Sequence, residues 1–264
     1  MMGRVLVVAG SDSGGGAGIQ ADIKAVTCLG GFAATAITAL TAQNTLGVFG
    51  VSEVPPDFVR LQMEVVLGDV GADCIKTGMM ASASIIEAVV AALIDFAPQV
   101  PLVVDPVMVA KGGAALLADS AAGALIRLLL PRARLLTPNI PEAEVLLGRT
   151  ISDLAAMERA AVDLLALGPK AVLLKGGHME GDDLVDLLAD SSGLRRFCGR
   201  RIASRSTHGT GCTLASSIAT GIAQGLELDA AVVRARDYVR KAIETAPGLG
   251  AGHGPLNHGH TVSF

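Results

Sequence analysis

The segments PLVVD, residues 101–105, and AVLLK, residues 171–175, decide the fold class predicted for this chain. Each is a short run of apolar, mostly branched residues that ends on one charged side chain. Runs without apolar–polar alternation are typical of strands buried on both faces, as in a parallel sheet. They indicate a sheet that is covered by helices on both sides.

Similar runs alternate with longer Ala- and Leu-rich segments along the whole chain. Strands are predicted at residues 4–9, 35–40, 73–76, 102–105, 135–137 and 171–175. Helices are predicted around residues 19–29, 57–66, 82–96, 120–130, 141–147, 153–167, 211–224 and 229–245. Residues 183–204 carry two short alternating runs around DSSG, a pattern that predicts an antiparallel hairpin at the sheet edge. The prediction is one α/β domain over residues 1–264 with a mostly parallel sheet.

Composition excludes several classes of protein. The chain has 264 residues, a net charge of −4 and 51% hydrophobic residues, which disfavours disorder. It has no block of Lys and Arg that would bind nucleic acid or an anionic membrane, so a small-molecule partner is predicted. Residues 25–52 carry no charge, but Gly30 and Gly31 interrupt them. A helix end, a turn and a buried strand are predicted there in place of a membrane span.

The four cysteines, Cys28, Cys74, Cys198 and Cys212, lie far apart and form no C-x-x-C pair. Free thiols in a reducing cytoplasm are expected, with neither a disulfide framework nor a zinc site. The first apolar run is too short for the core of a signal peptide and is predicted to be the first strand.

Polar residues stand where the predicted strands end. In an open parallel sheet, ligands bind beyond these carboxyl ends. Turn residues collect at strand ends in any protein, but here each end offers a different functional group. The predicted pocket contains a cation, two carboxylates and an amide, from Gln43 with Asn44, Thr77 with Gly78 and Met79, Asp105, Asn139 with Glu142, and Lys175.

The glycine-rich segment GSDSGGGAG, residues 10–18, is no standard nucleotide motif. It lacks the Lys-Ser or Lys-Thr pair of a Walker loop. Residues 16–21 match G-x-G-x-x-A, but they begin well after the first strand and no acidic residue lies between Asp22 and Glu53. We therefore expect a loop whose backbone approaches a flat ligand closely, with no Rossmann site.

The segment STHGTGCTLASS, residues 206–217, is predicted to begin a helix with an anion hole. Gly209 and Gly211 allow successive backbone N–H groups to point one way at the positive end of that helix. Such a hole would stabilise a phosphoryl group during transfer. The same field is expected to lower the pKa of Cys212 in the first turn. The alternative is that Cys212 is a small buried apolar residue, as most free cysteines are.

Seven segments, in this order, resemble the hydroxymethylpyrimidine/phosphomethylpyrimidine kinases of the ribokinase-like superfamily. They are GSDSGGGAGIQADIK, ITALTAQNTLGV, KTGMM, DPVMVAKGG, TPNIPEAE, LLKGGH and HGTGCTLASSIA, and the resemblance extends from about Val5 to GPLNH at residues 254–258. It implies a three-layer α/β/α fold, ATP with Mg²⁺, and a homodimer. It also implies two successive phosphorylations of 4-amino-5-hydroxymethyl-2-methylpyrimidine, with the phosphates near the second glycine motif and the pyrimidine near the first.

The resemblance assigns roles to individual residues. Gln43 would pair with the ring nitrogen and the amino group of the pyrimidine, and Cys212 would lie beside its hydroxymethyl oxygen. Lys175 would lie near the ATP phosphates, with Thr210 and Gly211 in the anion hole. Residues that match the enclosure of the ring or the Mg²⁺ site are Gly10, Ala17, Met79 and Val107 for the ring, and Asp105 and Glu142 for the metal and its waters. Gly209 and Asn139 are expected on the cofactor side.

Other interpretations remain open at this point. Asp105 could cap a turn and Glu142 could be a first-turn helix acid, and Met79 could belong to the core. Asp12, Asp22 and His208 could contact the ligand, but surface or capping roles are expected for them. A pyridoxal or pyridoxine kinase of the same superfamily is the nearest alternative function, and a non-catalytic pyrimidine sensor is one from another class. No thiamin-phosphate synthase extension is expected after residues 254–258.

Overall fold

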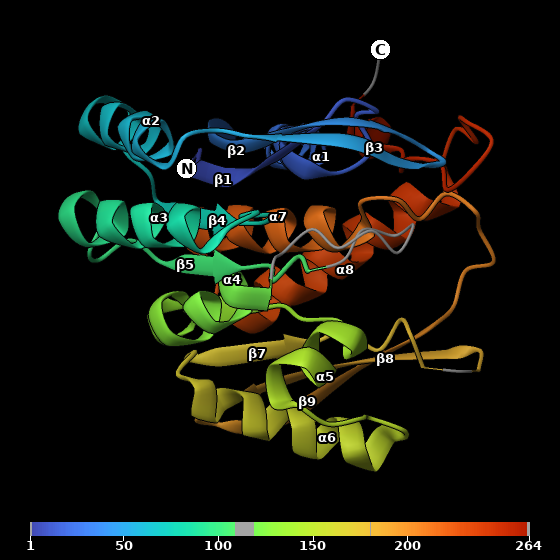
Figure 1. Ribbon diagram of the computed structural model, residues 1–264. Coiled ribbons are helices and arrows are strands. Elements are labelled where there is room, and N and C mark those ends of the chain that lie inside the picture. Colours follow the sequence, from blue (N-terminus) through green and yellow to red (C-terminus); the bar gives the residue numbers. More distant parts are fainter. Residues whose placement is uncertain (1, 109–118, 180, 263–264) are drawn as a thin grey trace.

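One sheet of nine strands runs through the described residues, 2–108, 119–179 and 181–262, of the computed structural model (Figure 1). The strand order is β3-β2-β1-β4-β5-β6-β7-β8-β9. The six strands from β2 to β7 are parallel, and β3, β8 and β9 are antiparallel to their neighbours. The strand bounds are β1 Arg4–Asp12, β2 Phe32–Asn44, β3 Gly47–Glu53, β4 Cys74–Thr77, β5 Leu102–Val104, β6 Leu135–Leu136, β7 Ala171–Leu174, β8 Asp183–Asp190 and β9 Gly193–Arg200. The predicted α/β class with a mostly parallel sheet is confirmed.

Two hydrophobic cores lie on opposite faces of this sheet, which explains the continuous apolar strands. In β1, Val5 and Val7 enter one core while Leu6 and Val8 enter the other. Successive side chains of a strand point to opposite faces, so a strand buried on both sides needs an unbroken apolar run. The helices form the two outer layers of the predicted α/β/α arrangement.

Helices α1 Gly18–Cys28, α7 Thr210–Ala223 and α8 Leu228–Glu244 cover one face. The other face is covered by α2 Pro56–Asp69, α3 Ala83–Phe96, α4 Asp119–Ala124, α5 Ile140–Leu147 and α6 Leu154–Asp163. Two predicted helices change type along their length. After α4 the chain continues as a π-helical turn, Leu125–Leu129, and a 3₁₀ turn, Leu130–Arg132, and after α6 as a 3₁₀ turn, Leu164–Leu167. A last 3₁₀ turn is formed by His258–Thr261.

The two edges of the sheet were not equally predictable. The hairpin of β8 and β9 confirms the antiparallel edge expected from residues 183–204. The opposite edge, β3, was not predicted, because Gly47 and Gly50 interrupt its apolar residues. The expectation of one buried strand within residues 25–52 is therefore wrong in part. That segment contains the end of α1, a half-buried β2 and a mostly exposed β3.

The structure bears on three further expectations. All four cysteines are free thiols. Within the described ranges, no helix is both long and apolar enough to cross a bilayer. In the same part of the chain, no group of three or more His, Cys, Asp or Glu side chains is placed to hold a metal ion.

Candidate active site

The ends of three neighbouring strands bring a cation and a carboxylate together. Asp105 follows β5, Thr137 follows β6 and Lys175 follows β7. Lys175 Nζ lies 3.1 Å from Asp105 Oδ1, and Thr137 Oγ1 donates to the same oxygen over 3.1 Å. Burial acts to lower the pKa of Lys175, but the carboxylates of Asp105 and Glu142 outweigh it and raise that pKa. The lysine therefore remains an ammonium ion at the strand ends that were predicted to form the pocket.

Helix α7 begins directly over this ion pair. A Cβ atom on Gly211 would lie 3.2 Å from Lys175 Nζ and 3.8 Å from Asp105 Oδ2. The helix is preceded by Gly209, whose φ of +78° is the left-handed conformation that glycine adopts at little cost. The first amides of a helix have no acceptor within it and point out of its positive end. An anion placed there would meet both these amides and the ammonium group of Lys175.

Thr210 shapes the start of α7. Its hydroxyl donates to the carbonyl oxygen of Thr207 over 2.8 Å, and its amide donates to the same oxygen over 3.4 Å. The amide of Thr213 donates to the carbonyl oxygen of Gly209 over 2.9 Å. The outward-facing amides of this turn are therefore those of Gly211 and Cys212, which lie between these two residues.

Asn139 and Glu142 form a capping box at the start of α5. Asn139 Oδ1 accepts from the Glu142 amide over 2.9 Å, and Glu142 Oε2 accepts from the Asn139 amide over 2.8 Å. Burial raises the pKa of Glu142 to about 7, against the opposing effect of Lys175. Glu142 is therefore an acidic residue in the first turn of a helix, which the sequence analysis gave as the alternative to a role at the Mg²⁺ site. Its carboxyl group also lies within the electrostatic reach of the Lys175–Asp105 pair.

Cys212 lies in the first turn of α7, but its thiol has the opposite electrostatic character to the one predicted. Burial raises the pKa of Cys212 to about 12, although the residue is only partly buried, because the protein packs densely around its sulfur. Lys76 and the backbone amide of Gly18 lower that pKa, while Asp22 and Asp105 raise it further. The prediction of a lowered pKa is wrong, because the cost of burying a thiolate exceeds the favourable effect of the helix start. The unliganded site therefore holds a neutral thiol.

A buried ion pair beneath α7 was missed by the sequence analysis. Lys76 Nζ lies 3.0 Å from both carboxylate oxygens of Asp22, and both side chains are fully buried. Ser216 Oγ, one helical turn after Cys212, donates to Asp22 Oδ1 over 2.7 Å. The surface or capping role expected for Asp22 is wrong. The sequence feature that could have indicated this pair is Lys76, the one charged residue within the apolar segment CIKTGMM.

The first glycine-rich loop packs against the start of α7. Asp12 holds the loop, since its carboxylate accepts from the amides of Gly14, Gly16 and Ala17 over 2.8 to 3.0 Å. A Cβ atom on Gly209 would lie only 1.9 Å from the carbonyl oxygen of Gly16. The surface role expected for Asp12 is wrong, since the residue is only 2% exposed, and its carboxylate caps the turn of the loop while α1 has no side-chain N-cap. The two glycine motifs, about 200 residues apart in sequence, therefore form one surface.

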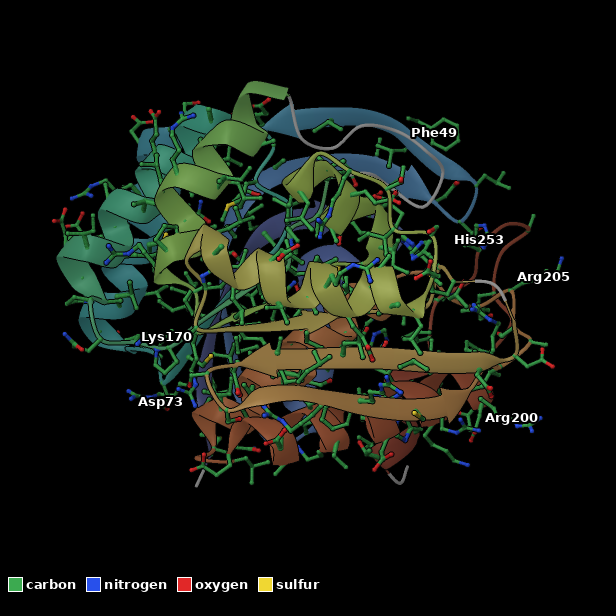
Figure 2. The ribbon with its side chains drawn as sticks, turned by 90° about the horizontal axis from the view of Figure 1, so that it is seen from below. Phe49, Asp73, Lys170, Arg200, Arg205 and His253 are labelled. Atoms are coloured by element: carbon green, nitrogen blue, oxygen red, sulfur yellow. The ribbon has the colours of Figure 1, made fainter. Side chains whose placement is uncertain are left out.

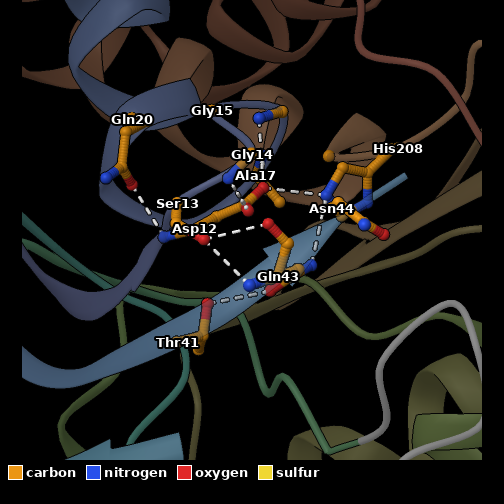
Figure 3. Close-up of polar contacts among 12 residues, drawn as sticks. Asp12, Ser13, Gly14, Gly15, Ala17, Gln20, Thr41, Gln43, Asn44 and His208 are labelled. Atoms are coloured by element: carbon orange, nitrogen blue, oxygen red, sulfur yellow. Dashed lines mark hydrogen bonds and ion pairs between the residues drawn. The ribbon is translucent and has the colours of Figure 1, made fainter. Parts of the chain in front are cut away.

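The residues assigned to the pyrimidine ring come from four segments. A Cβ atom on Gly10 would lie 3.1 Å from Met79 Sδ, so these two residues are in contact. Met79 is 8% exposed and belongs to the larger core. Val107 follows Asp105 and donates its amide to the carbonyl oxygen of that residue over 2.9 Å. Gln43 lies at the end of β2, opposite the glycine-rich loop (Figure 3).

His208 joins Gln43 to the loop. Its Nε2 lies 2.9 Å from Asp12 Oδ2 and 3.3 Å from Gln43 Nε2 (Figure 3). The His208 side chain is 12% exposed, so the surface role expected from sequence is wrong. The sequence feature that could have indicated a role for His208 in the site is its position in HGTGCT, next to the glycines that start α7.

Comparison with known families agrees with this geometry. The model of the family described as phosphomethylpyrimidine kinase matches residues 12–257. The chain belongs to the phosphomethylpyrimidine kinase family. The match includes Asp12, Gln43, Lys175 and Cys212, and so takes in both glycine motifs and the ion pair between them.

Two curated relatives show how the family match extends over the chain. A hydroxymethylpyrimidine/phosphomethylpyrimidine kinase of Bacillus subtilis is 46% identical over 256 residues, which cover 97% of this chain and 94% of that protein. The thiamine biosynthesis bifunctional protein ThiED of Geobacter sulfurreducens is 54% identical over 97% of this chain. The chain spans about half, 52%, of that bifunctional protein.

Two solved structures share the fold. A phosphomethylpyrimidine kinase from Clostridium difficile is 41% identical with a TM-score of 0.81, over 91% of this chain and 99% of that one. The pyridoxal kinase of Staphylococcus aureus in complex with AMP-PCP and pyridoxal is 32% identical with a TM-score of 0.89, over 98% and 94% of the two chains. The ribokinase-like fold implied by the sequence is therefore confirmed.

The C-terminal segment is fixed to α7 through a histidine whose titration should be visible in stability. His258 Nε2 lies 2.9 Å from Thr213 Oγ1, and burial lowers the pKa of His258 from 6.5 to about 4. A lowered pKa means that the unfolded chain binds the proton more tightly. The free energy of unfolding should therefore decrease as the pH falls from 6.5 through 4, by roughly 3 kcal/mol from this residue.

Urea unfolding of the wild type and of His258→Gln at several pH values measures this contribution. The difference between the two curves should shrink as the pH falls, because glutamine does not titrate. His253→Gln, at an exposed position in the same C-terminal region, is the control and should leave the pH dependence unchanged. Parallel curves for the wild type and His258→Gln would contradict the assignment.

Proposed function

We propose that this protein transfers the terminal phosphoryl group of ATP to 4-amino-5-hydroxymethyl-2-methylpyrimidine and then to the resulting monophosphate, as in thiamine biosynthesis. The observation that carries this proposal is the start of α7 over the Lys175–Asp105 pair. Phosphoryl transfer requires positioning and charge stabilisation more than covalent chemistry from the protein. The family and the names of its relatives support the reaction.

On the phosphate side, the outward amides of Gly211 and Cys212 and the ammonium of Lys175 would stabilise the charge of the transferring group. Gly209 and Thr210 hold this turn in place, and Asn139 lies beside Lys175 through a bridge between their backbones. The pyridoxal kinase structure with AMP-PCP supports an ATP site in this fold.

The carboxylates present fit a Mg²⁺ ion that keeps much of its hydration. Asp105 Oδ1 is engaged by Lys175 and Thr137, while Oδ2 faces the start of α7. Mg²⁺ in kinases is bound by one or two carboxylates together with waters and phosphate oxygens. Asp105 would hold the ion directly and Glu142 through its waters. When bound, Mg²⁺ supplies neutralisation of the phosphate charge.

On the acceptor side, Gln43 would pair with the aminopyrimidine edge, since an amide offers a donor and an acceptor together. Gly10, Ala17, Met79 and Val107 would enclose the ring. Cys212 would lie beside the hydroxymethyl oxygen, because the amide of Gly18 in the glycine-rich loop faces its thiol. The two glycine motifs thus bring the acceptor and the phosphate to the same helix start.

Product analysis tests this proposal. The protein is incubated with ATP, Mg²⁺ and the aminopyrimidine alcohol, and products are followed by mass spectrometry. The monophosphate should form first and the diphosphate second, with one ADP released at each step. Failure to release ADP with this alcohol or with pyridoxal would overturn the proposal and favour the non-catalytic sensor.

As the thiolate, Cys212 would accept the proton of the hydroxymethyl group, in the position where most ribokinase relatives have an aspartate base, and Cys212→Ala tests this role. Because the pKa of Cys212 is raised to about 12, few molecules carry the thiolate at neutral pH, and turnover should rise as the pH increases above neutrality. Removing the thiol should lower kcat by about 10²-fold and abolish that rise, since general bases contribute at least this much. Initial rates between pH 7 and 9 measure both effects. Full turnover in Cys212→Ala would exclude the role.

A pyridoxal kinase activity is the second candidate. It is favoured by the likeness, at 32% identity, to a structure that contains pyridoxal. Pyridoxal also carries a hydroxymethyl group, but it lacks the amino group next to a ring nitrogen that Gln43 would recognise. The ratio of kcat/KM for the aminopyrimidine and for pyridoxal distinguishes the two assignments.

We also propose a homodimer that forms through the outer surface of β2 and β3. Leu46, Phe49 and Val51, on β3 and the turn before it, are 48 to 71% exposed, and β3 leaves one edge of the sheet unpaired (Figure 2 labels Phe49). Contiguous exposed apolar residues mark interaction surfaces. Phe49→Ser should weaken dimerisation by at least about tenfold, as loss of a central aromatic contact does. Sedimentation velocity measures this, and an unchanged dimer would place the interface elsewhere.

We propose a cytoplasmic location, because the four free cysteines suit a reducing compartment. Cys198 is exposed and no partner cysteine protects it. A cell fractionation that placed the protein outside the cytoplasm would overturn this proposal.

A further inference from the structure

Gln43 is held between two groups whose hydrogen-bonding capacity fixes the direction of its amide. Its Nε2 lies 3.3 Å from His208 Nε2, and its Oε1 lies 3.2 Å from Thr41 Oγ1 on the other side (Figure 3). An amide can turn over about its last carbon–carbon bond with no change of shape, which exchanges its oxygen and its nitrogen. The neighbours therefore decide which end offers the donor.

His208 can present only a donor to Gln43. Its Nε2 lies 2.9 Å from Asp12 Oδ2, and the pKa of Asp12 is lowered, since the hydrogen bond from His208 and those from the loop amides outweigh its burial. Asp12 is therefore a carboxylate, which accepts hydrogen bonds only. A lone pair on Nε2 would face that carboxylate across 2.9 Å, so Nε2 carries a proton. This one proton points to Asp12, so Gln43 can take part only as the second acceptor of a three-centre hydrogen bond and must offer its oxygen, because an N–H of Gln43 would face the N–H of His208.

Thr41 leads independently to the same orientation. Its single hydroxyl proton is donated to the carbonyl oxygen of Ser11 over 2.9 Å. Thr41 Oγ1 can then only accept from Gln43, and so requires the amide nitrogen. Both neighbours are satisfied together when the oxygen of Gln43 is on the His208 side and the nitrogen is on the Thr41 side, which is the amide of Figure 3 turned over.

We propose that His208 and Thr41 are positioning residues that lock the amide of Gln43 and thereby select a 4-aminopyrimidine over its 4-oxo counterpart. This inference rests on the proposed function. A locked amide accepts from the exocyclic amino group on its His208 side and donates to the ring nitrogen on its Thr41 side. In the 4-oxo compound the ring nitrogen is a donor and the exocyclic oxygen an acceptor, so like groups would face each other at both positions.

The predicted selectivity is large, because a site built for one hydrogen-bonding pattern leaves buried groups unpaired with the other. We expect the wild type to prefer the 4-amino alcohol by at least about 10³-fold in kcat/KM. Either His208→Ala or Thr41→Val removes one of the two constraints and should reduce the preference at least about tenfold, and the double variant should bring it near unity. KM for ATP should stay within about twofold, since neither residue contacts the phosphate side.

The experiment measures ADP release with the 4-amino and the 4-oxo hydroxymethylpyrimidines for the wild type, both single variants and the double variant. His253→Ala, an exposed histidine of the C-terminal region, is the control and should retain the full preference (Figure 2). Thr41→Val is nearly isosteric, so it tests the inference even if His208→Ala folds poorly. A preference that is unchanged in Thr41→Val and in the double variant would overturn the inference. A wild type inactive on the 4-amino alcohol would instead overturn the proposed function.

Discussion

Lys175→Met is expected to lower kcat/KM for ATP about 10³-fold, because cationic groups at the transferring phosphoryl group contribute on this scale. Lys175 is the only cationic side chain shown in contact with Asp105 and the start of α7 within the described part of the chain. Binding of the pyrimidine should change little, since Gln43 and the glycine-rich loop lie at the other end of the site. Steady-state kinetics with each substrate varied in turn measures the two effects separately.

Lys170→Met is the matched control for this prediction. Lys170 lies just before β7 and is exposed, whereas Lys175 follows the same strand at its other end (Figure 2 labels Lys170). Both variants lose one positive charge, but only one lies at the proposed phosphate site. Far-ultraviolet circular dichroism should show that both are folded. A loss of less than about tenfold in Lys175→Met would remove Lys175 from the transfer step.

Lys76→Met is expected to reduce the free energy of unfolding by about 3–5 kcal/mol, because Asp22, whose pKa burial already raises, is left buried without its partner. Burial acts to lower the pKa of Lys76. The two carboxylate oxygens of Asp22, each 3.0 Å from Lys76 Nζ, outweigh this effect and raise the pKa of Lys76, so its ammonium group stays charged. Urea unfolding measures the loss. Lys76→Met/Asp22→Asn should recover part of it, since the amide can still accept from Ser216 without a buried charge.

Arg60→Met is the control for the second prediction. Arg60 and Asp95 are 2.8 Å apart, but their side chains are 34% and 48% exposed. Water screens such an ion pair, so the free energy of unfolding of the variant should fall by less than about 1 kcal/mol. Equal losses for Lys76→Met and Arg60→Met would contradict a special role for the buried pair.

The sheet could be predicted because a strand buried on both faces requires an unbroken run of apolar residues, which is visible in the sequence. Apolar runs such as LVV at Leu102–Val104 have one interpretation once helical segments alternate with them. β3 has no such apolar run, since its side chains are mostly exposed and two glycines interrupt it. An edge strand is specified by its pairing with a neighbour, and that pairing is a property of the folded sheet.

The candidate site was predictable in its residue types but not in its electrostatics. Asp105 and Lys175 were placed together because both end buried parallel strands. The pKa of Cys212 could not be predicted, because it depends on how completely α1 and the glycine-rich loop cover the thiol. Lys76 and Asp22 are 54 residues apart, so their pairing appears only when α1 packs on the sheet. Long-range packing decides these properties.

A crystal structure with a non-hydrolysable ATP analogue, Mg²⁺ and the aminopyrimidine alcohol tests the location of transfer most directly. Our account predicts the terminal phosphoryl group within hydrogen-bonding distance of the Gly211 and Cys212 amides, with the hydroxymethyl oxygen between it and the sulfur of Cys212. A terminal phosphoryl group bound instead in the loop of residues 10–18, or an alcohol turned away from Cys212, would contradict it.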